Sequence, residues 1–142
     1  MSFEEKNQWA FGLVTVVTYT VYVVIILGRA QSMPLTEVPY QWTMVGAIVA
    51  AIVAGILANI AISISSPKDA GRKDERDREI NRRGEYIGQS LVVMGGVAAL
   101  IMAMLEVDYF WIANAIYLFF VLSALLGTTA KLVAYRRGFA SW

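Results

Sequence analysis

Two residue types that carry much of protein chemistry, cysteine and histidine, are missing from this 142-residue chain. Without cysteine there is no disulfide or thiol chemistry, which excludes membrane enzymes that generate disulfides. Without histidine there is no imidazole ligand for haem, and intramembrane proteases that use a serine–histidine pair are excluded. The usual nitrogen and sulfur ligands of metal sites are absent as well. We therefore expect no cofactor, no metal and no enzymatic activity.

Charge is missing from most of the chain. Four segments contain no Asp, Glu, Lys or Arg, namely residues 7–28, 38–67, 86–105 and 109–130. Roughly 20 apolar residues in a helix cross the ~30 Å hydrocarbon layer of a bilayer. The sequence therefore predicts an all-α integral membrane four-helix bundle, a single domain over residues 1–142. Its expected spans are residues 8–28, 41–64, 86–105 and 109–135.

Ionisable groups are nearly absent from the expected spans. The exception is Lys131, at the inner end of the fourth span, where its long side chain can reach the membrane surface. Ion-coupled transporters and proton pumps usually need acids or bases within the membrane, and small multidrug exporters depend on a glutamate in their first helix. The scarcity of such groups therefore excludes ion-coupled transporters, proton pumps and small multidrug exporters. All three prolines lie outside the spans, so the broken helices typical of transporters are not expected either.

The basic residues predict the orientation of the chain. An even number of spans puts both termini and the loop over 65–85 on one side of the membrane. Of the twelve Lys and Arg residues, only Arg29 falls on the other side. Short loops rich in Lys and Arg stay in the cytoplasm. We expect both termini and this loop to be cytoplasmic, and the helix that contains the 86–105 span to begin there, near Pro67 or after Gly71.

Small residues recur at helical spacing in two spans. The expected packing residues are Ala47, Ala51 and Gly55 in the second span and Gly95 and Ala99 in the third. Such spacing lets helix backbones approach closely in lipid. One interpretation is that these faces hold the monomer's own helices together. The other, which is compatible with it, is that the second span also forms a homodimer face.

A few polar side chains lie within the spans and form a candidate cavity. They are Thr15, Thr18, Tyr19 and Tyr22 on one face of the first span, Asn59 in the second and Gln89 in the third. They are candidates to line a small-molecule cavity. Alternatively, each hydroxyl bonds a carbonyl one turn back and the amides join neighbouring helices, as is common in membranes.

Six basic residues gather in and just after the cytoplasmic loop. These candidates for contact with a partner or with anionic lipid are Arg72, Lys73, Arg76, Arg78, Arg82 and Arg83. Acidic residues alternate with them and predict helical pairs such as Glu79–Arg83. The alternative interpretation is therefore a solvated, self-paired helix extension that only sets the topology. Glu75 and Glu79 share a face, but the surrounding arginines oppose binding of a cation there.

The run from Lys73 to Ile80, with Asp-Glu-Arg at 74–76, precedes a glycine-containing span. It resembles uncharacterised small prokaryotic membrane proteins with four helices, families of unknown function that carry this motif before a hydrophobic helix pair. The likeness covers residues 68–137. It implies a multi-pass protein of the prokaryotic cytoplasmic (inner) membrane and no activity. Such proteins often accompany small helix-turn-helix regulators, which implies a cytoplasmic protein partner.

Arg78, Asn81 and Glu85 are similar to a set in four-helix membrane enzymes that use glutathione. The spacing from Asn81 to Glu85 is one residue longer than in that family. The set also precedes the third span, whereas the family places it at the second helix.

Our preferred hypothesis is a non-enzymatic membrane protein that forms homo-oligomers, with a dimer favoured. Its charged extension contacts a cytoplasmic partner or the lipid surface, and no nucleic acid. The alternatives are small-molecule binding or permeation through the polar cavity, and a glutathione-transferase-like enzyme.

Overall fold

The computed structural model describes residues 3–65 and 75–137 and places most of them in four long helices. The elements are α1 (Phe3–Arg29), the short 3-10 turn η1 (Leu35–Glu37), α2 (Gln41–Ser65), α3 (Glu75–Met104) and α4 (Tyr109–Arg137). All four α-helices are long and apolar enough to cross a membrane, and the described residues include no strand. The prediction of an all-α membrane protein with four helices is confirmed, and the chain is a multi-pass membrane protein.

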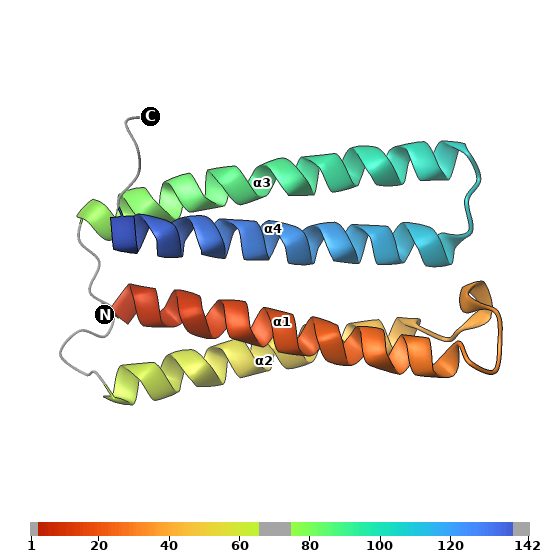
Figure 1. The fold of residues 1–142 in the computed structure, drawn as a ribbon, viewed down its shortest axis with the longest axis horizontal. Helices are drawn as coiled ribbons and strands as arrows, with labels where there is room; N and C mark the ends of the chain where they lie inside the picture. The colour runs from red at the N-terminus through yellow and green to blue at the C-terminus, as the bar shows by residue number, and fades with distance from the viewer. Residues whose placement is uncertain (1–2, 66–74, 138–142) are drawn as a thin grey trace.

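The four helices pack as a bent row in the order α2–α1–α4–α3, rather than as a closed square. α1 packs against both α2 and α4, and α4 packs against both α1 and α3, so that α2 and α3 lie at the two edges (Figure 1). The α3–α4 contact is the most extensive in the molecule. α2, at its edge, has no buried residue at all. Most of its apolar surface is therefore left for lipid or for another protein.

A turn of a few residues holds α3 and α4 antiparallel. Glu106 has a φ of 58°, the left-handed conformation that ends many helices. The amides of Glu106 and Val107 donate to the carbonyls of Ala103 and Met102, over 3.1 and 3.0 Å. The Asp108 carboxylate then accepts a 2.9 Å bond from the Phe110 amide and caps the start of α4. With one helix capped directly before the next begins, the two must run side by side.

The end of the bundle that holds this turn is closed by an aromatic core. The core joins α1, the η1 loop and α4 through Tyr22, Ile26, Val38, Tyr40, Phe110, Tyr117 and Val121. Arg29 fastens the η1 loop by donating 2.7 Å bonds to the Pro39 carbonyl and the Thr43 hydroxyl. Burial, with the nearby Tyr109 and Asp108, raises the pKa of Tyr40, so its phenol stays neutral.

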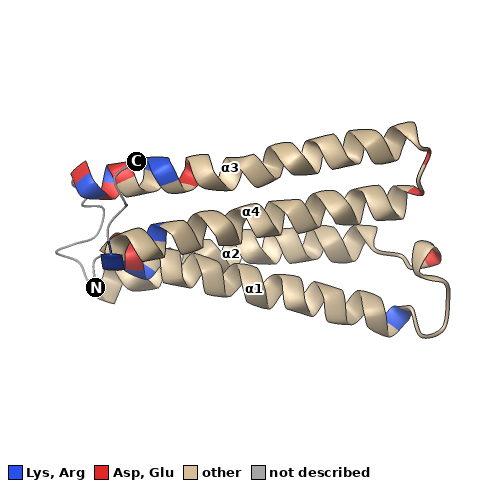
Figure 2. Cartoon of the chain, turned by 45° about the horizontal axis from the view of Figure 1, so that its top comes forward, with Lys and Arg blue, Asp and Glu red and all other residues tan. Residues whose placement is uncertain are grey.

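Most charges gather at the opposite end, where α1 and α3 begin and α2 and α4 end (Figure 2). We call it the charged end. α3 has 30 residues and α4 has 29. At 1.5 Å per residue each is roughly 45 Å long, about 15 Å more than a hydrocarbon layer. Residues 75–85 of the expected loop are thus the first turns of α3. The helix start expected near Pro67 or after Gly71 lies outside the described residues.

Candidate binding surfaces at the charged end

The first turns of α3 are packed against the last turns of α4. A stripe on α3 is buried, comprising Asp77, Ile80, Gly84 and Gly88. These positions follow the three-to-four-residue spacing of one helix face. Ile80 forms a small apolar cluster with Ala134 and Tyr135 of α4. The charged extension of α3 is therefore one half of a two-helix unit, and its orientation depends on α4.

Polar contacts add to this packing. Arg76 donates to the Ala134 carbonyl over 3.3 Å and to the Tyr135 carbonyl over 2.8 Å, and its guanidinium lies 5.6 Å from the centre of the Tyr135 ring. The final carbonyls of a helix lack hydrogen-bond partners within that helix. A cation at this position donates hydrogen bonds to them and interacts favourably with the negative end of the helix dipole. The Tyr135 hydroxyl donates a 2.6 Å bond to the buried Asp77 carboxylate.

The opposite side of the same turns is exposed and carries alternating charges, Glu75, Arg78, Glu79 and Arg82. We call these four residues the outer charged face. Arg78 lies 3.4 Å from Glu75, a pair that is largely exposed. The predicted Glu79–Arg83 pair is confirmed at 2.8 Å. Of the six expected contact residues, Arg76 is engaged with α4, Arg78 and Arg82 are on this face, and Arg83 is half-buried and paired with Glu79. Arg72 and Lys73 lie outside the described residues.

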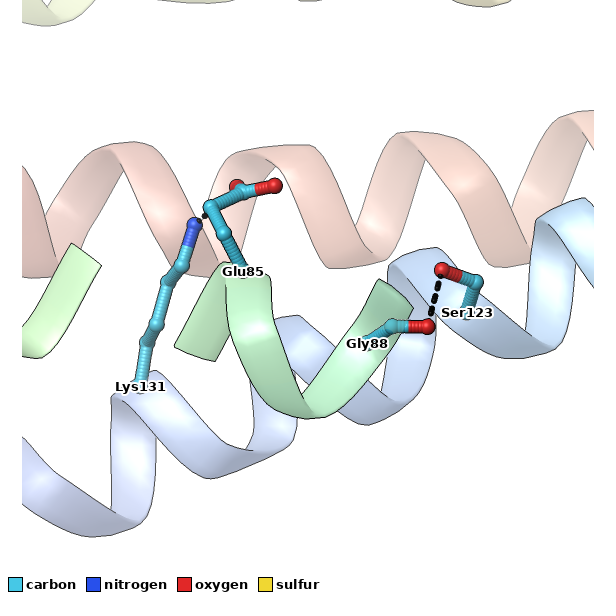
Figure 3. A network of polar contacts seen from close by, with 4 residues as sticks. All are labelled: Glu85, Gly88, Ser123 and Lys131. Carbon is cyan, nitrogen blue, oxygen red and sulfur yellow. Dashed lines mark hydrogen bonds and ion pairs between the residues drawn. The ribbon is translucent and has the colours of Figure 1, made fainter. Parts of the chain in front are cut away.

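A crevice lies between α1, α3 and α4, just inside the charged end. It has a volume of about 280 Å³ and is bordered by Phe11, Gly88 and Thr128. Lys131 is only 6% exposed, and its ammonium meets the Glu85 carboxylate at 2.6 Å (Figure 3). A Cβ at position 84 would overlap the side-chain carbons of Lys131. The absence of a side chain at Gly84 therefore leaves room for the Lys131 side chain to pass over α3.

The backbones of α3 and α4 approach closely just beyond that ion pair. The Ser123 hydroxyl donates a 2.7 Å bond to the Gly88 carbonyl (Figure 3). A Cβ on Gly88 would lie 2.8 Å from the Ser123 carbonyl oxygen, and one on Gly127 would lie 3.2 Å from the Gly84 carbonyl oxygen. Such small residues with interhelical hydrogen bonds are how helices associate in lipid.

A groove runs between α1 and α2 at the charged end. α1 and α2 pack where Met44 and Ala47 meet the aromatic core, and they draw apart toward the start of α1 (Figure 1). The groove has a volume of about 690 Å³. Glu4, Asn7 and Asn59 are among its lining residues. Among the described residues that line it, Glu4 is the only charged one.

The expected cavity residues are dispersed. Thr15 and Thr18 bond carbonyls of their own helix, at Phe11 and Val14, over 2.8 Å. Tyr19 and Tyr22 pack edge-on against Tyr117, and the Tyr22 hydroxyl donates to the Asn114 side-chain oxygen. The hydroxyls of Thr15, Thr18 and Tyr22 thus bond within a helix or to a neighbouring helix, as in the alternative interpretation.

The two amides of that set lie far from these hydroxyls and from each other. The Asn59 amide donates a 3.0 Å bond to the Asn7 side-chain oxygen across the α1–α2 groove. Gln89 is exposed on α3 and lines a different, shallow hollow with Tyr86, Ser90 and Val93. Because α2 and α3 occupy opposite edges of the row, Asn59 and Gln89 do not come together.

The expected packing residues have different surroundings in α3 and in α2. Gly95 of α3 touches α4, since a Cβ there would lie 2.6 Å from the Phe119 Cβ, and Ala99 is half-buried. On α2, Ala47 packs against the aromatic core, whereas Ala51 and Gly55 line the α1–α2 groove. Nothing lies within 4 Å of a Cβ built on Gly55. Small residues with the same spacing therefore contact the neighbouring helix at Gly95 of α3 but face open space at Gly55 of α2.

Several residues of these surfaces were not singled out from the sequence, chiefly Glu4, Asn7, Asp77 and Tyr135. Asn7, Asp77 and Tyr135 each bond a side chain on another helix, and Glu4 lines a groove formed with another helix. Spacing along one helix cannot reveal either property. Of the glutathione-type set, Arg78 pairs with Glu75 and Glu85 with Lys131. Within residues 3–65 and 75–137, no cluster of acidic side chains could hold a metal ion.

Compared with family models, curated proteins and solved structures, the chain has no match. The resemblance to small prokaryotic membrane proteins therefore stays a prediction. Functional inference depends on the surfaces of this chain alone.

Proposed function

We propose that the protein is a non-enzymatic multi-pass protein of the prokaryotic cytoplasmic membrane that docks a cytoplasmic protein on the outer charged face of α3. The observation that carries this proposal is the locking of the first turns of α3 to α4. Arg76 and Asp77 both bond α4, over 2.8 and 2.6 Å to Tyr135, while Arg78 and Arg82 point away. A helix face held in place loses less conformational entropy on binding than a mobile loop does.

The charge pattern of this face favours a protein over the lipid surface. Two acids, Glu75 and Glu79, alternate with two bases, Arg78 and Arg82, so the face is formally neutral. A surface of anionic lipid attracts clusters of basic residues and is repelled by the acids among them. A protein can place complementary charges opposite each position, which gives specificity and orientation.

The test is photo-crosslinking in intact cells. A photoreactive amino acid replaces Glu79 in the full-length chain, between the two exposed arginines. We expect a discrete crosslinked cytoplasmic protein, and at least a tenfold weaker band when Arg78→Glu and Arg82→Glu are combined, since two charge pairs become repulsive. Arg76 is left unchanged because it satisfies the end of α4.

Arg137→Glu is the matched control, because Arg137 is exposed at the same end but belongs to α4. It should leave the band unchanged. A band of equal strength in all three proteins, or crosslinks to lipid alone, would rule out protein docking on this face. Comparable membrane levels of the variants exclude a defect in insertion.

We also propose that two copies associate through α2. This helix has no charged residue and no buried residue, and its Gly46 and Ala50 are exposed at the edge of the row. Because the chain has no cysteine, Ala50→Cys would be a single reactive site. Oxidation in native membranes should give a disulfide-linked dimer, whereas the exposed Val93→Cys on α3 should stay monomeric. Equal crosslinking at both positions would argue against this interface.

A further inference from the structure

The α1–α2 groove has a polar mouth and an apolar body. Its mouth, at the charged end, carries Glu4, Asn7, Gln8, Asn59 and Ser63. Farther along α2 the lining becomes Ile56, Gly55, Ile52 and Ala51. From Asn59 to Ala51 is about 12 Å along the helix axis. Polar groups at the membrane boundary followed by apolar walls within the membrane match the two parts of an amphiphile.

Glu4 gives the mouth of the groove a negative charge, which favours a positively charged ligand. The residue is only 7% exposed and lines the groove. In the part of the chain that the structure describes, it has neither a hydrogen-bond partner nor an ion-pair partner. The adjacent Glu5 differs, because its carboxylate lies 3.0 Å from the Arg136 guanidinium. A largely buried carboxylate that faces a groove and has no partner gains from a cation placed beside it, so a cation at Glu4 would be favourable.

The amides at the mouth supply further hydrogen-bonding groups. Asn59 donates to the Asn7 side-chain oxygen over 3.0 Å, which leaves the Asn7 N–H groups free to donate and the Asn59 oxygen free to accept. Ser63 adds a hydroxyl one turn from Asn59. Beside one carboxylate, these groups suit a headgroup that combines an ammonium with a phosphate ester.

We propose that this groove binds a membrane phospholipid whose headgroup carries a primary ammonium. The ammonium donates to the Glu4 carboxylate, the phosphate lies near Asn7, and one acyl chain follows Gly55 and Ile52. A quaternary ammonium has no N–H to donate, and an anionic headgroup is repelled by Glu4, so headgroup chemistry determines selectivity. This site lies on α1 and α2 and does not depend on docking at α3.

The test is native mass spectrometry of the full-length protein released from vesicles of equal parts phosphatidylethanolamine, phosphatidylcholine and phosphatidylglycerol. We expect the wild type to retain one phosphatidylethanolamine per chain, with about a tenfold preference over phosphatidylcholine, as for one charge-assisted hydrogen bond. Glu4→Gln should bring the preference near parity. Gly55→Leu, which fills the apolar body of the groove, should lose the retained lipid altogether.

Two control variants match these changes. Glu75→Gln removes one negative charge from α3, and Gly46→Leu adds the same side chain to α2 at a site that, like Gly55, has nothing within 4 Å of its Cβ. Both should retain lipid as the wild type does. If Gly55→Leu keeps its lipid, or if Glu4→Gln keeps the full preference, the proposal is wrong.

Other occupants of the groove give distinct results. If a second copy fills it, Gly55→Leu converts dimers to monomers while retention of phosphatidylethanolamine does not change, which overturns the proposal. If another segment of the same chain fills it, the wild type retains no lipid selectively, which also overturns it. Loss of lipid in Gly55→Leu with retention in Gly46→Leu supports the groove as the binding site, whatever the state of assembly.

Discussion

The α3–α4 hairpin and the α1–α2 pair are both antiparallel helix pairs with regularly spaced small residues, yet they pack differently. In the hairpin, Gly88 and Gly127 meet the backbone of the opposite helix, and a Cβ on Gly88 would lie 2.8 Å from the Ser123 carbonyl oxygen. In the α1–α2 pair, Gly55 faces open space and the helices draw apart toward the charged end. The first arrangement makes a rigid unit, and the second leaves a groove.

The difference shows that small-residue spacing permits close packing without causing it. The hairpin has a four-residue turn with caps on both helices, a buried lysine paired with Glu85, and Arg76 bonded to the end of α4. The α1–α2 pair is joined through the η1 loop, and its packed region is near that loop. At the charged end the described residues offer one bond between α1 and α2, from Asn59 to Asn7.

The largest effect that tests this comparison is expected from Gly88→Leu. The new side chain would collide with the backbone of α4 at Ser123, which cannot move as a flexible side chain can. We expect a loss of about 3 kcal/mol in the free energy of unfolding, as for a severe overpacking. SDS titration of the protein in mixed micelles, followed by circular dichroism, measures it.

Gly96→Leu is the control on the same helix, because nothing lies within 4 Å of a Cβ on Gly96. There the substitution should be neutral or slightly stabilising, since leucine has a higher helix propensity than glycine. Equal losses in the two variants would mean that the hairpin is not held by a close approach at Gly88.

A smaller effect is expected from Tyr135→Phe. The change removes the 2.6 Å hydrogen bond to Asp77, a carboxylate that is only 8% exposed. A bond to a buried charged group contributes about 1.5 kcal/mol, and the same titration should show a loss of that size. Photo-crosslinking at Glu79 should also weaken, because the first turns of α3 would be less firmly held.

Tyr86→Phe is the corresponding control, since Tyr86 is 78% exposed on α3. Its hydroxyl faces solvent or headgroups, and its loss should change stability by less than about 0.5 kcal/mol. If both variants behave alike, the Asp77–Tyr135 bond does not hold the extension to α4.

The four helices were predictable because their signal is local. Each span is a run of some twenty residues without charge, and the turn at Glu106–Asp108 is too short for any arrangement other than neighbours. The Glu79–Arg83 pair followed from spacing within a single helix. The order of helices in the row was not predictable, because apolar faces in lipid carry no marker of which helix they meet.

The candidate surfaces were predicted only in part, for the same reason. The basic residues were identified, but Arg76 was grouped with Arg78 and Arg82, although it bonds carbonyls of α4 more than 50 positions away. Glu4, Asn7 and Asn59 line a common groove because α1 and α2 draw apart at that end. Such a divergence depends on how the whole row packs, and no pattern within α1 or α2 indicates it.

The smallest expected effect is that of Gly55→Leu on stability, and it contradicts what the small-residue spacing alone would suggest. If Ala47, Ala51 and Gly55 formed a close crossing, leucine at 55 would cost as much as at 88. With open space at Gly55, the new side chain enters the groove, and the free energy of unfolding should change by less than about 0.5 kcal/mol. A loss near that of Gly88→Leu would mean that α1 and α2 are tightly packed in the membrane. In that case the two helix pairs would be equivalent and the groove would not exist.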